Sequence, residues 1–238
     1  ITHFFNPPRY MQLLELVRGE HTTVDTYNKM VAFGEIVLGK GIVHAKDTPN
    51  FIGNRIGIFG MMTAINLALE HDLKVEEVDK LTGIISGRPK SATFRTADVV
   101  GLDILKNVSL TTYEKAIDDE SRELFKIPEI LDNLIVSNRL GKKTGSGFYK
   151  KNKDRTIHSV DFKTGEYSPQ DLVRFDCFRV AKDKQRLSER IISLCDGDDR
   201  GSKYFWELTS QTLIYSANRI PEISDDIVNI DNAMRWGF

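Results

Sequence analysis

The residues best suited to acid–base chemistry are His3 and Glu15. His3 lies in a β-prone run, residues 1–5, and Glu15 lies in the next apolar run, residues 13–17. Two adjacent strands would bring the two side chains together, at a sheet edge that leads into the irregular Asn6-Pro7-Pro8 loop. A carboxylate bound to an imidazole fixes its tautomer and favours its protonated form. The pair is therefore a candidate general base with its orienting carboxylate.

Spacing alone also allows a purely structural interpretation. In it, His3 is a buried histidine with a local partner and Glu15 is a surface carboxylate, and spacing by itself favours this alternative. Asn54 lies one turn into an apolar helix predicted over residues 51–70, where a buried amide needs a partner: either a ligand or the local backbone. Lys142 and Lys143 lie in a glycine-flanked loop. They could bind a phosphate or carboxylate, or they could be ordinary solvent-exposed lysines.

Several other site types are excluded by pattern. The sequence contains no H-E-x-x-H and no G-x-S-x-G, and its GKKTGSG loop follows a predicted helix, so it is not a phosphate-binding P-loop. The five histidines are scattered without ligand spacing, and Cys177 and Cys195 have no second ligand pair. We expect no metal site, and two free thiols in a reducing compartment.

The composition excludes further classes of partner. Lys and Arg number 33 and Asp and Glu 34, which gives a net charge of -1 and no basic surface for nucleic acid or an anionic membrane. No apolar run approaches the roughly 18 residues of a transmembrane helix. Its 40% hydrophobic and 28% charged residues are typical of a globular chain. The sequence predicts a cytoplasmic location.

The element pattern predicts a mainly α fold. Residues 1–46 read as strand, strand, helix and strand, the last part of an α/β nucleotide-binding domain. Residues 47–150 predict a first helical domain, and residues 151–238 a second, truncated one that begins with a hairpin and has a helix over residues 169–194. Similar layouts at residues 67–87 and 214–237 suggest that the two helical domains are repeated units. Because the chain begins at Ile1 inside a strand, we expect it to be cut from a longer protein.

Four motifs in order resemble the 3-hydroxyacyl-CoA dehydrogenase family. They span residues 3–149, and the remainder resembles the second helical unit of the long, fused hydratase–dehydrogenase members. The four are HFFNPPRYMQLLEL (3–16), KDTPNFIGNRI (46–56), DVVGLD (98–103) and GKKTGSGFY (141–149).

The resemblance implies a role for five residues. His3 falls at the family's catalytic base and Glu15 at the carboxylate that orients it. Asn54 falls at a substrate-contacting asparagine, and Asn6 and Lys143 fall at positions that contact the NAD cofactor. The implied reaction is oxidation of the 3-hydroxyl of a 3-hydroxyacyl-CoA to the 3-ketoacyl-CoA in fatty-acid β-oxidation.

The sequence also departs from the family pattern. The glycine-rich dinucleotide fingerprint is absent, so the chain alone is expected to be inactive. Position 50 is Asn where the family usually has Gly, and residues 87–98 replace a segment that is usually rich in proline and glycine. An alternative hypothesis is a helical dimerisation or assembly module without catalysis of its own, and the resemblance also implies a possible homodimer. A related dehydrogenase of a small hydroxy acid is a third possibility, which the HFFNP segment disfavours.

Overall fold

The computed structural model describes residues 1–237, and the chain forms two compact units. Unit 1 contains Ile1–Ile58 together with the C-terminal segment, which we define as residues 212–237, and unit 2 contains Phe59–Gln211. The two long helices α2 (Gly53–Glu70) and α9 (Arg200–Asn218) each contribute residues to both units.

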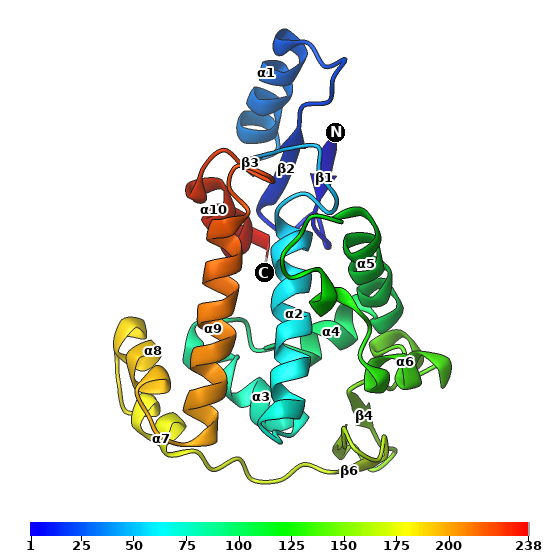
Figure 1. Cartoon of the computed structure of the whole chain (residues 1–238), viewed down its shortest axis with the longest axis vertical. Helices are drawn as coiled ribbons and strands as arrows, with labels where there is room; N and C mark the ends of the chain where they lie inside the picture. Colours follow the sequence, from blue (N-terminus) through cyan, green and yellow to red (C-terminus); the bar gives the residue numbers. More distant parts are fainter. Residues whose placement is uncertain (238) are drawn as a thin grey trace. The chain divides into compact units, whose positions relative to one another are not determined.

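Unit 1 is built on a three-stranded sheet in the order β1-β2-β3 (Figure 1). Strand β1 (Thr2–Phe4) runs antiparallel to β2 (Leu13–Val17), which runs parallel to β3 (Gly41–Ala45). A parallel pair needs a crossover connection, and α1 (Val24–Ala32) with the π-helical turn η1 (Phe33–Val37) supplies it.

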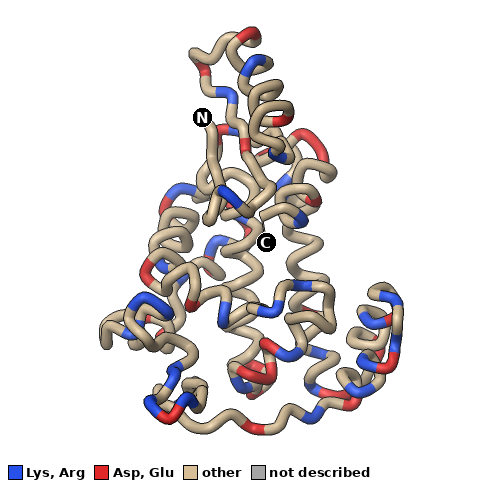
Figure 2. Tube along the Cα trace, turned by 180° about the vertical axis from the view of Figure 1, so that it is seen from behind, with Lys and Arg blue, Asp and Glu red and all other residues tan. Residues whose placement is uncertain are grey.

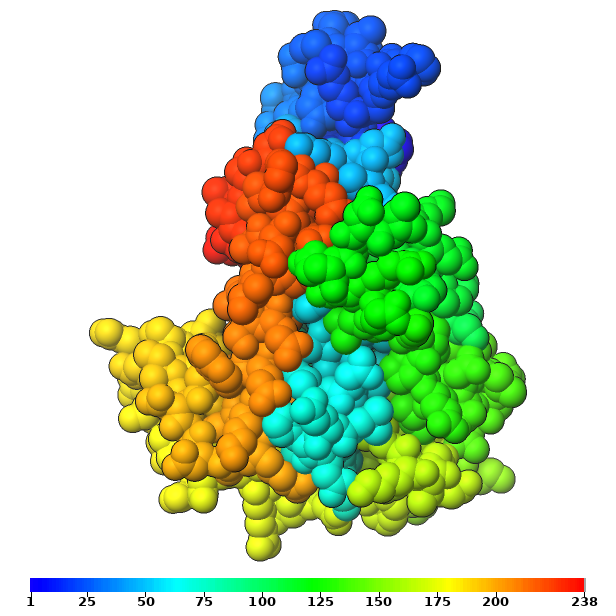
Figure 3. Space-filling model, viewed as in Figure 1, coloured from blue at the N-terminus to red at the C-terminus, as the bar shows by residue number. Residues whose placement is uncertain are grey.

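Helix α1 begins at a threonine cap. The hydroxyl of Thr23 caps it by accepting the backbone N–H of Thr26 at 3.2 Å. One side of α1 packs on the apolar side chains of the sheet, while α1 and η1 are visible at the molecular surface (Figure 3). The exposed large apolar side chains of α1 and η1 are Val24, Phe33, Ile36 and Val37. The packed residues are Leu14, Leu16 and Ile42 of the sheet and Tyr27, Met30 and Val31 of the helix.

The C-terminal segment packs on the same sheet. Helix α10 (Ile227–Gly237) contacts β2 and β3 (Figure 1). A Cβ at Gly41 would approach the Trp236 ring to 2.4 Å, so only glycine permits this close contact. The Asn229 side chain accepts the backbone N–H of His44 at 2.8 Å. The segment therefore both covers the sheet and satisfies a backbone donor of β3.

Unit 2 is helical with a second small sheet. Its strands β4 (Tyr149–Lys151), β5 (Ile157–Val160) and β6 (Tyr167–Pro169) pair antiparallel in that order. Its other elements are helices and single helical turns, in order α3 (Val75–Leu81), η2 (Ile84–Ser86), α4 (Phe94–Val100), α5 (Leu102–Lys115), η3 (Arg122–Phe125), α6 (Glu129–Val136), η4 (Lys142–Thr144), α7 (Asp176–Lys182) and α8 (Leu187–Cys195).

Two buried aspartates join these elements. Asp79 on α3 accepts the N–H of Phe94 at the start of α4 at 2.6 Å and the hydroxyl of Tyr149 at 2.9 Å. Asp98 on α4 accepts the N–H groups of Phe148 and Tyr149 at 2.8 and 2.9 Å. Burial raises the pKa of both carboxyls to about 6, against the lowering effect of these hydrogen bonds.

The glycines of the GKKTGSGFY motif are explained by Asp98. A Cβ at Gly147 would lie 2.0 Å from its carboxylate oxygen, and a Cβ at Gly141 would lie 2.3 Å from its carbonyl oxygen. Gly141 also has a φ of 97°, which side chains rarely adopt. The motif therefore brings the backbone up to a buried carboxylate, and its glycines have a structural reason.

The prediction of a mainly α fold with two repeated helical domains is wrong. Each unit contains a three-stranded sheet in addition to its helices. The two segments thought to repeat differ in packing, because residues 67–87 lead into α3 of unit 2 whereas residues 214–237 cover the sheet of unit 1. Their common layout is that of helix starts in general. The predicted domain bounds at 46/47 and 150/151 stay predictions.

The helix predicted over residues 169–194 is also interrupted. The chain leaves β6 at Pro169, runs without regular structure to Phe175, and then forms α7 and α8 as separate short helices. None of the described helices combines the length and the hydropathy needed to span a bilayer. Basic and acidic residues are interspersed along both units (Figure 2).

The raised pKa of Asp98 predicts a pH-dependent stability. Between about pH 4 and pH 6 the native state holds a proton that the unfolded chain has released, so the free energy of unfolding falls as the pH rises through this window. Asp98→Asn should remove this contribution. The total fall in the free energy of unfolding between about pH 4 and pH 6 should then be smaller by roughly 1–3 kcal/mol, and the variant should be less stable overall. Urea unfolding between pH 4 and 7 tests this, and a wild-type slope in the variant would contradict it.

Candidate active site

His3 and Glu15 face each other across the β1–β2 pair. The two residues are direct partners in the strand register, and His3 Nδ1 lies 2.5 Å from Glu15 Oε2. The His3 side chain is 29% exposed, whereas Glu15 is fully buried. Because the carboxylate accepts a hydrogen bond from Nδ1–H, Nε2 is the ring nitrogen left to exchange a proton with a ligand.

The second oxygen of Glu15 is held by the start of α2. Glu15 Oε1 accepts the backbone N–H groups of Ile52 at 3.1 Å and Gly53 at 2.7 Å. These N–H groups belong to the positive end of the helix, which compensates a buried negative charge. A Cβ at Gly53 would approach the Phe5 ring to 2.6 Å, so glycine is required at this position. The carboxylate thus has three donors, one from β1 and two from the start of α2.

Two aromatic rings lie beside the imidazole. The ring of Phe5 lies 4.8 Å and that of Phe51 5.7 Å from the His3 ring, measured between centroids, and both are tilted. Asn50 and Phe51 have φ values of 65° and 51°, in the left-handed region. Asn tolerates this conformation better than most side chains, which explains how it replaces the glycine of the family pattern. A left-handed Phe51 costs roughly 1–2 kcal/mol.

The remaining three predicted residues differ in their surroundings. Asn54 is half-buried and follows Gly53 in the first turn of α2. Asn6 is exposed in the loop that follows β1. Lys143 belongs to unit 2, where its Nζ contacts both carboxylate oxygens of Asp103 at 2.5 and 2.7 Å. Unit 1 therefore contains His3, Glu15, Asn54 and Asn6 but not Lys143.

Sequence reasoning missed Arg55. Its side chain is fully buried and donates to Tyr215 and Glu222 of the C-terminal segment. The available signal was a permanently charged residue within an apolar helix, since a buried guanidinium requires acceptors. The sequence did not reveal where these acceptors are.

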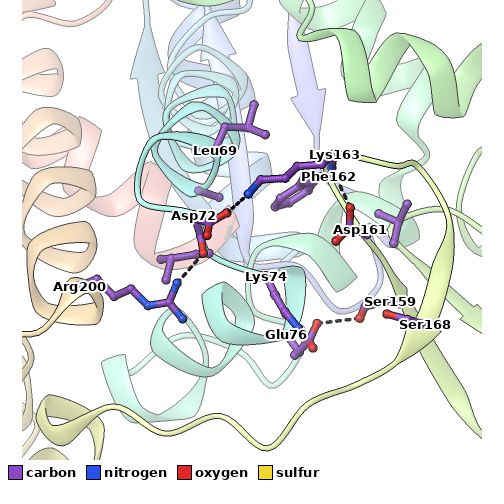
Figure 4. Close-up of a pocket in the computed structure, with 13 residues that line it drawn as sticks. Leu69, Asp72, Lys74, Glu76, Ser159, Asp161, Phe162, Lys163, Ser168 and Arg200 are labelled. Carbon is purple, nitrogen blue, oxygen red and sulfur yellow. Dashed lines mark hydrogen bonds and ion pairs between the residues drawn. The ribbon is translucent and has the colours of Figure 1, made fainter.

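A cavity in unit 2 is lined by α2, α3 and the β5–β6 hairpin (Figure 4). Its charged groups are already engaged with one another. Lys163 pairs with Asp72 at 2.6 Å, and Ser159 donates to Glu76 at 2.6 Å. Arg200 donates to the Asp72 carbonyl at 2.5 Å. These contacts tie the hairpin and α9 to the end of α2 within the unit, and they do not point to a ligand.

The cysteines and acidic groups give no sign of a metal centre. Over residues 1–237, no three His, Cys, Asp or Glu side chains are grouped so that they could hold a metal ion. Cys177 and Cys195 are free thiols. Burial raises the pKa of the Cys177 thiol to about 12, so it stays protonated and unreactive at neutral pH.

The geometry defines an α/β protein with a histidine–carboxylate pair at a helix N-terminus, and comparison with known families identifies the class. Residues 1–48 match the 3-hydroxyacyl-CoA dehydrogenase NAD binding domain, and residues 51–151 match the 3-hydroxyacyl-CoA dehydrogenase C-terminal domain. The chain belongs to the 3-hydroxyacyl-CoA dehydrogenase family. The first match confirms the prediction of NAD as the cofactor of this family domain.

Several relatives match the whole chain, two of them at clearly different identities. A probable 3-hydroxyacyl-CoA dehydrogenase of Bacillus subtilis is 46% identical over 100% of this chain and 30% of its own length. A putative fatty acid oxidation complex trifunctional enzyme of Rickettsia felis is 30% identical over 100% of this chain and 32% of its own length. The chain therefore spans about a third of the length of these relatives.

A solved structure resembles the fold over almost the entire chain. The 3-hydroxybutyryl-CoA dehydrogenase of Escherichia coli superposes with a TM-score of 0.66 at 18% identity, over 99% of this chain and 60% of that one. At this identity the likeness concerns the fold alone. It agrees with the mixed helix and strand content described above and not with an all-helical class.

The three donors around Glu15 predict a large stability effect. In Glu15→Gln the amide NH₂ would face either the N–H groups of Ile52 and Gly53, which then lose their acceptor, or Nδ1 of His3, which must then change tautomer to accept. In both orientations the charge-assisted hydrogen bonds of the buried carboxylate are lost. We expect a loss of about 2–4 kcal/mol in the free energy of unfolding, measured with urea. The exposed Glu35→Gln is the control and should change stability by less than about 0.5 kcal/mol. Equal stability of both variants would contradict the prediction.

Proposed function

We propose that these residues belong to an NAD-dependent 3-hydroxyacyl-CoA dehydrogenase in which His3 is the general base. The observation that carries the proposal is the hydrogen bond between His3 and a fully buried Glu15, which is itself held by two backbone N–H groups. A buried carboxylate with three donors cannot turn away, so the imidazole is fixed before a substrate binds.

The proposed reaction assigns a proton transfer to His3. Nε2 takes the proton of the substrate 3-hydroxyl as this carbon becomes the ketone of a 3-ketoacyl-CoA. NAD, when bound, supplies the acceptor for the hydride that leaves the same carbon. Glu15 stabilises the imidazolium that forms, and its two backbone donors keep its geometry constant through the step.

Three further residues complete the proposal. Asn54 donates a hydrogen bond to the substrate near the reacting carbon, which its half-buried position one residue beyond Gly53 supports. Asn6, exposed at the end of the strand that carries His3, contacts NAD through its side-chain amide, a group able to donate to and accept from ribose hydroxyls. Lys143 also contacts NAD in the proposal, and its partly exposed ammonium group suits a phosphate.

The biological setting is part of the proposal. The name of the Rickettsia felis relative, a putative fatty acid oxidation complex trifunctional enzyme, supports a role in fatty-acid oxidation within a multifunctional enzyme. A cytoplasmic location is part of the same proposal. A homodimer, and the alternative of an assembly module without catalysis, stay predictions. The His3–Glu15 geometry favours the enzyme, because a module that only packs has no need to hold a partly exposed imidazole against a buried carboxylate.

The role of His3 predicts a selective loss of activity. In the full-length protein, His3→Gln should lower the kcat of acetoacetyl-CoA reduction by NADH about 10²–10⁴-fold, because the proton transfer loses its acid–base group. Circular dichroism should show an unchanged fold. The exposed His21→Gln is the matched control and should retain the wild-type rate. Full activity in His3→Gln would rule out the role of His3.

The 238-residue chain taken alone should bind NADH poorly. Its sequence contains no G-x-G-x-x-G loop, whose backbone N–H groups and helix N-terminus bind the pyrophosphate in dinucleotide-binding domains. We expect no heat of binding in calorimetry with NADH concentrations that saturate the full-length protein, and no reduction of acetoacetyl-CoA. Tight NADH binding by the isolated chain would contradict this.

A further inference from the structure

Arg55 links the start of α2 to the C-terminal segment within unit 1. Its side chain is fully buried, and its Nε donates to the hydroxyl of Tyr215 at 2.6 Å. Its Nη2 contacts Glu222 Oε1 at 3.0 Å. Arg219 donates to the other oxygen of Glu222 at 2.7 Å and lies 4.8 Å from the Tyr215 ring centroid. We call these four residues the arginine cluster.

Arg55, the member of the arginine cluster on α2, lies within one helical turn of the donors that hold Glu15. Arg55 is two residues beyond Gly53, whose N–H binds the carboxylate at 2.7 Å. A helical turn is rigid over this distance, since successive hydrogen bonds fix its backbone. Any movement of the Arg55 backbone therefore moves the Ile52 and Gly53 N–H groups, which in turn aim Glu15 at His3.

The position of this turn is not set by the local chain alone. Asn50 and Phe51, immediately before it, adopt left-handed φ values that cost free energy and persist only where surrounding contacts impose them. Glu15 holds the turn from the β2 side, and Tyr215 and Glu222 hold it through Arg55. Removing one of these anchors leaves a strained backbone free to relax.

We infer that the C-terminal segment is a positioning element for the His3–Glu15 pair and acts through Arg55, with Tyr215 and Glu222 as positioning residues. The inference rests on the proposed function. Residues 212–237 lie outside both stretches that match the family domains, residues 1–48 and 51–151. The segment thus adds an anchor to the active site that the family motifs do not contain.

The test removes the anchors without touching the pair. Glu222→Gln keeps the size of the side chain but removes its charge, and Tyr215→Phe keeps the ring but removes the hydroxyl that accepts from Arg55. In the full-length protein we expect each variant to lower the kcat of acetoacetyl-CoA reduction about 10-fold or more, because misplacement of about 1 Å costs up to roughly 100-fold. The KM values for acetoacetyl-CoA and NADH should stay within about twofold.

Two readouts do not depend on catalysis. The proton on His3 Nδ1, which is hydrogen-bonded to Glu15, gives a downfield NMR resonance that should shift upfield in both variants. Hydrogen exchange of the Ile52 and Gly53 amides should accelerate, because their acceptor is no longer held in line. A purely structural contribution to unfolding would leave both local signals in the native state unchanged.

Asn229→Ala is the matched control. It removes a contact between the same C-terminal segment and β3, at the N–H of His44, without touching the arginine cluster. It should lower the melting temperature but leave kcat and the His3 resonance at wild-type values. The inference is overturned if Glu222→Gln and Tyr215→Phe behave like Asn229→Ala, or if all three lose kcat in proportion to their stability.

The outcomes separate this inference from the proposed function. If the wild-type protein does not reduce acetoacetyl-CoA while the NMR and exchange signals respond as expected, the proposed reaction fails and the positioning link stands. If the wild-type protein is active and neither signal responds to the two substitutions, the link fails and the reaction stands.

Discussion

Burial of the Glu15 carboxylate is the constraint on which the rest of unit 1 depends. A charge withdrawn from water must be met by donors, and it receives three: the imidazole of His3 and the N–H groups of Ile52 and Gly53. Meeting this need fixes β1 against β2 and brings the start of α2 to the sheet. The same requirement that stabilises the fold therefore aligns the proposed catalytic base.

Unit 2 also buries carboxylates, and their contacts differ from those of Glu15. Asp79 and Asp98 are buried carboxylates that accept backbone N–H groups and a tyrosine hydroxyl, and they join α3, α4 and β4. Their donors are backbone N–H groups and a tyrosine hydroxyl rather than an imidazole, so these contacts hold the fold together. In our proposal the buried Glu15 serves catalysis in unit 1, and the difference lies in its contact with a histidine.

Local sequence reasoning succeeded where short-range physics decides the structure. It placed His3 and Glu15 on adjacent strands and predicted the apolar helix that begins near residue 51. It failed in the fold class and over residues 169–194, where the predicted single helix is replaced by an irregular stretch and the separate helices α7 and α8. A shared pattern of helix starts also suggested a repeat that the packing does not support.

The sequence by itself determined the family motifs, the types of the candidate catalytic residues and their order. Only the tertiary structure decided what makes them a site. Glu15 finds its backbone donors 37 and 38 residues away, and Arg55 finds its acceptors 160 and 167 residues away on a segment that also covers the sheet. Spacing along a chain carries no information on contacts of this range, because they are selected by the burial of charge and apolar surface in the folded whole.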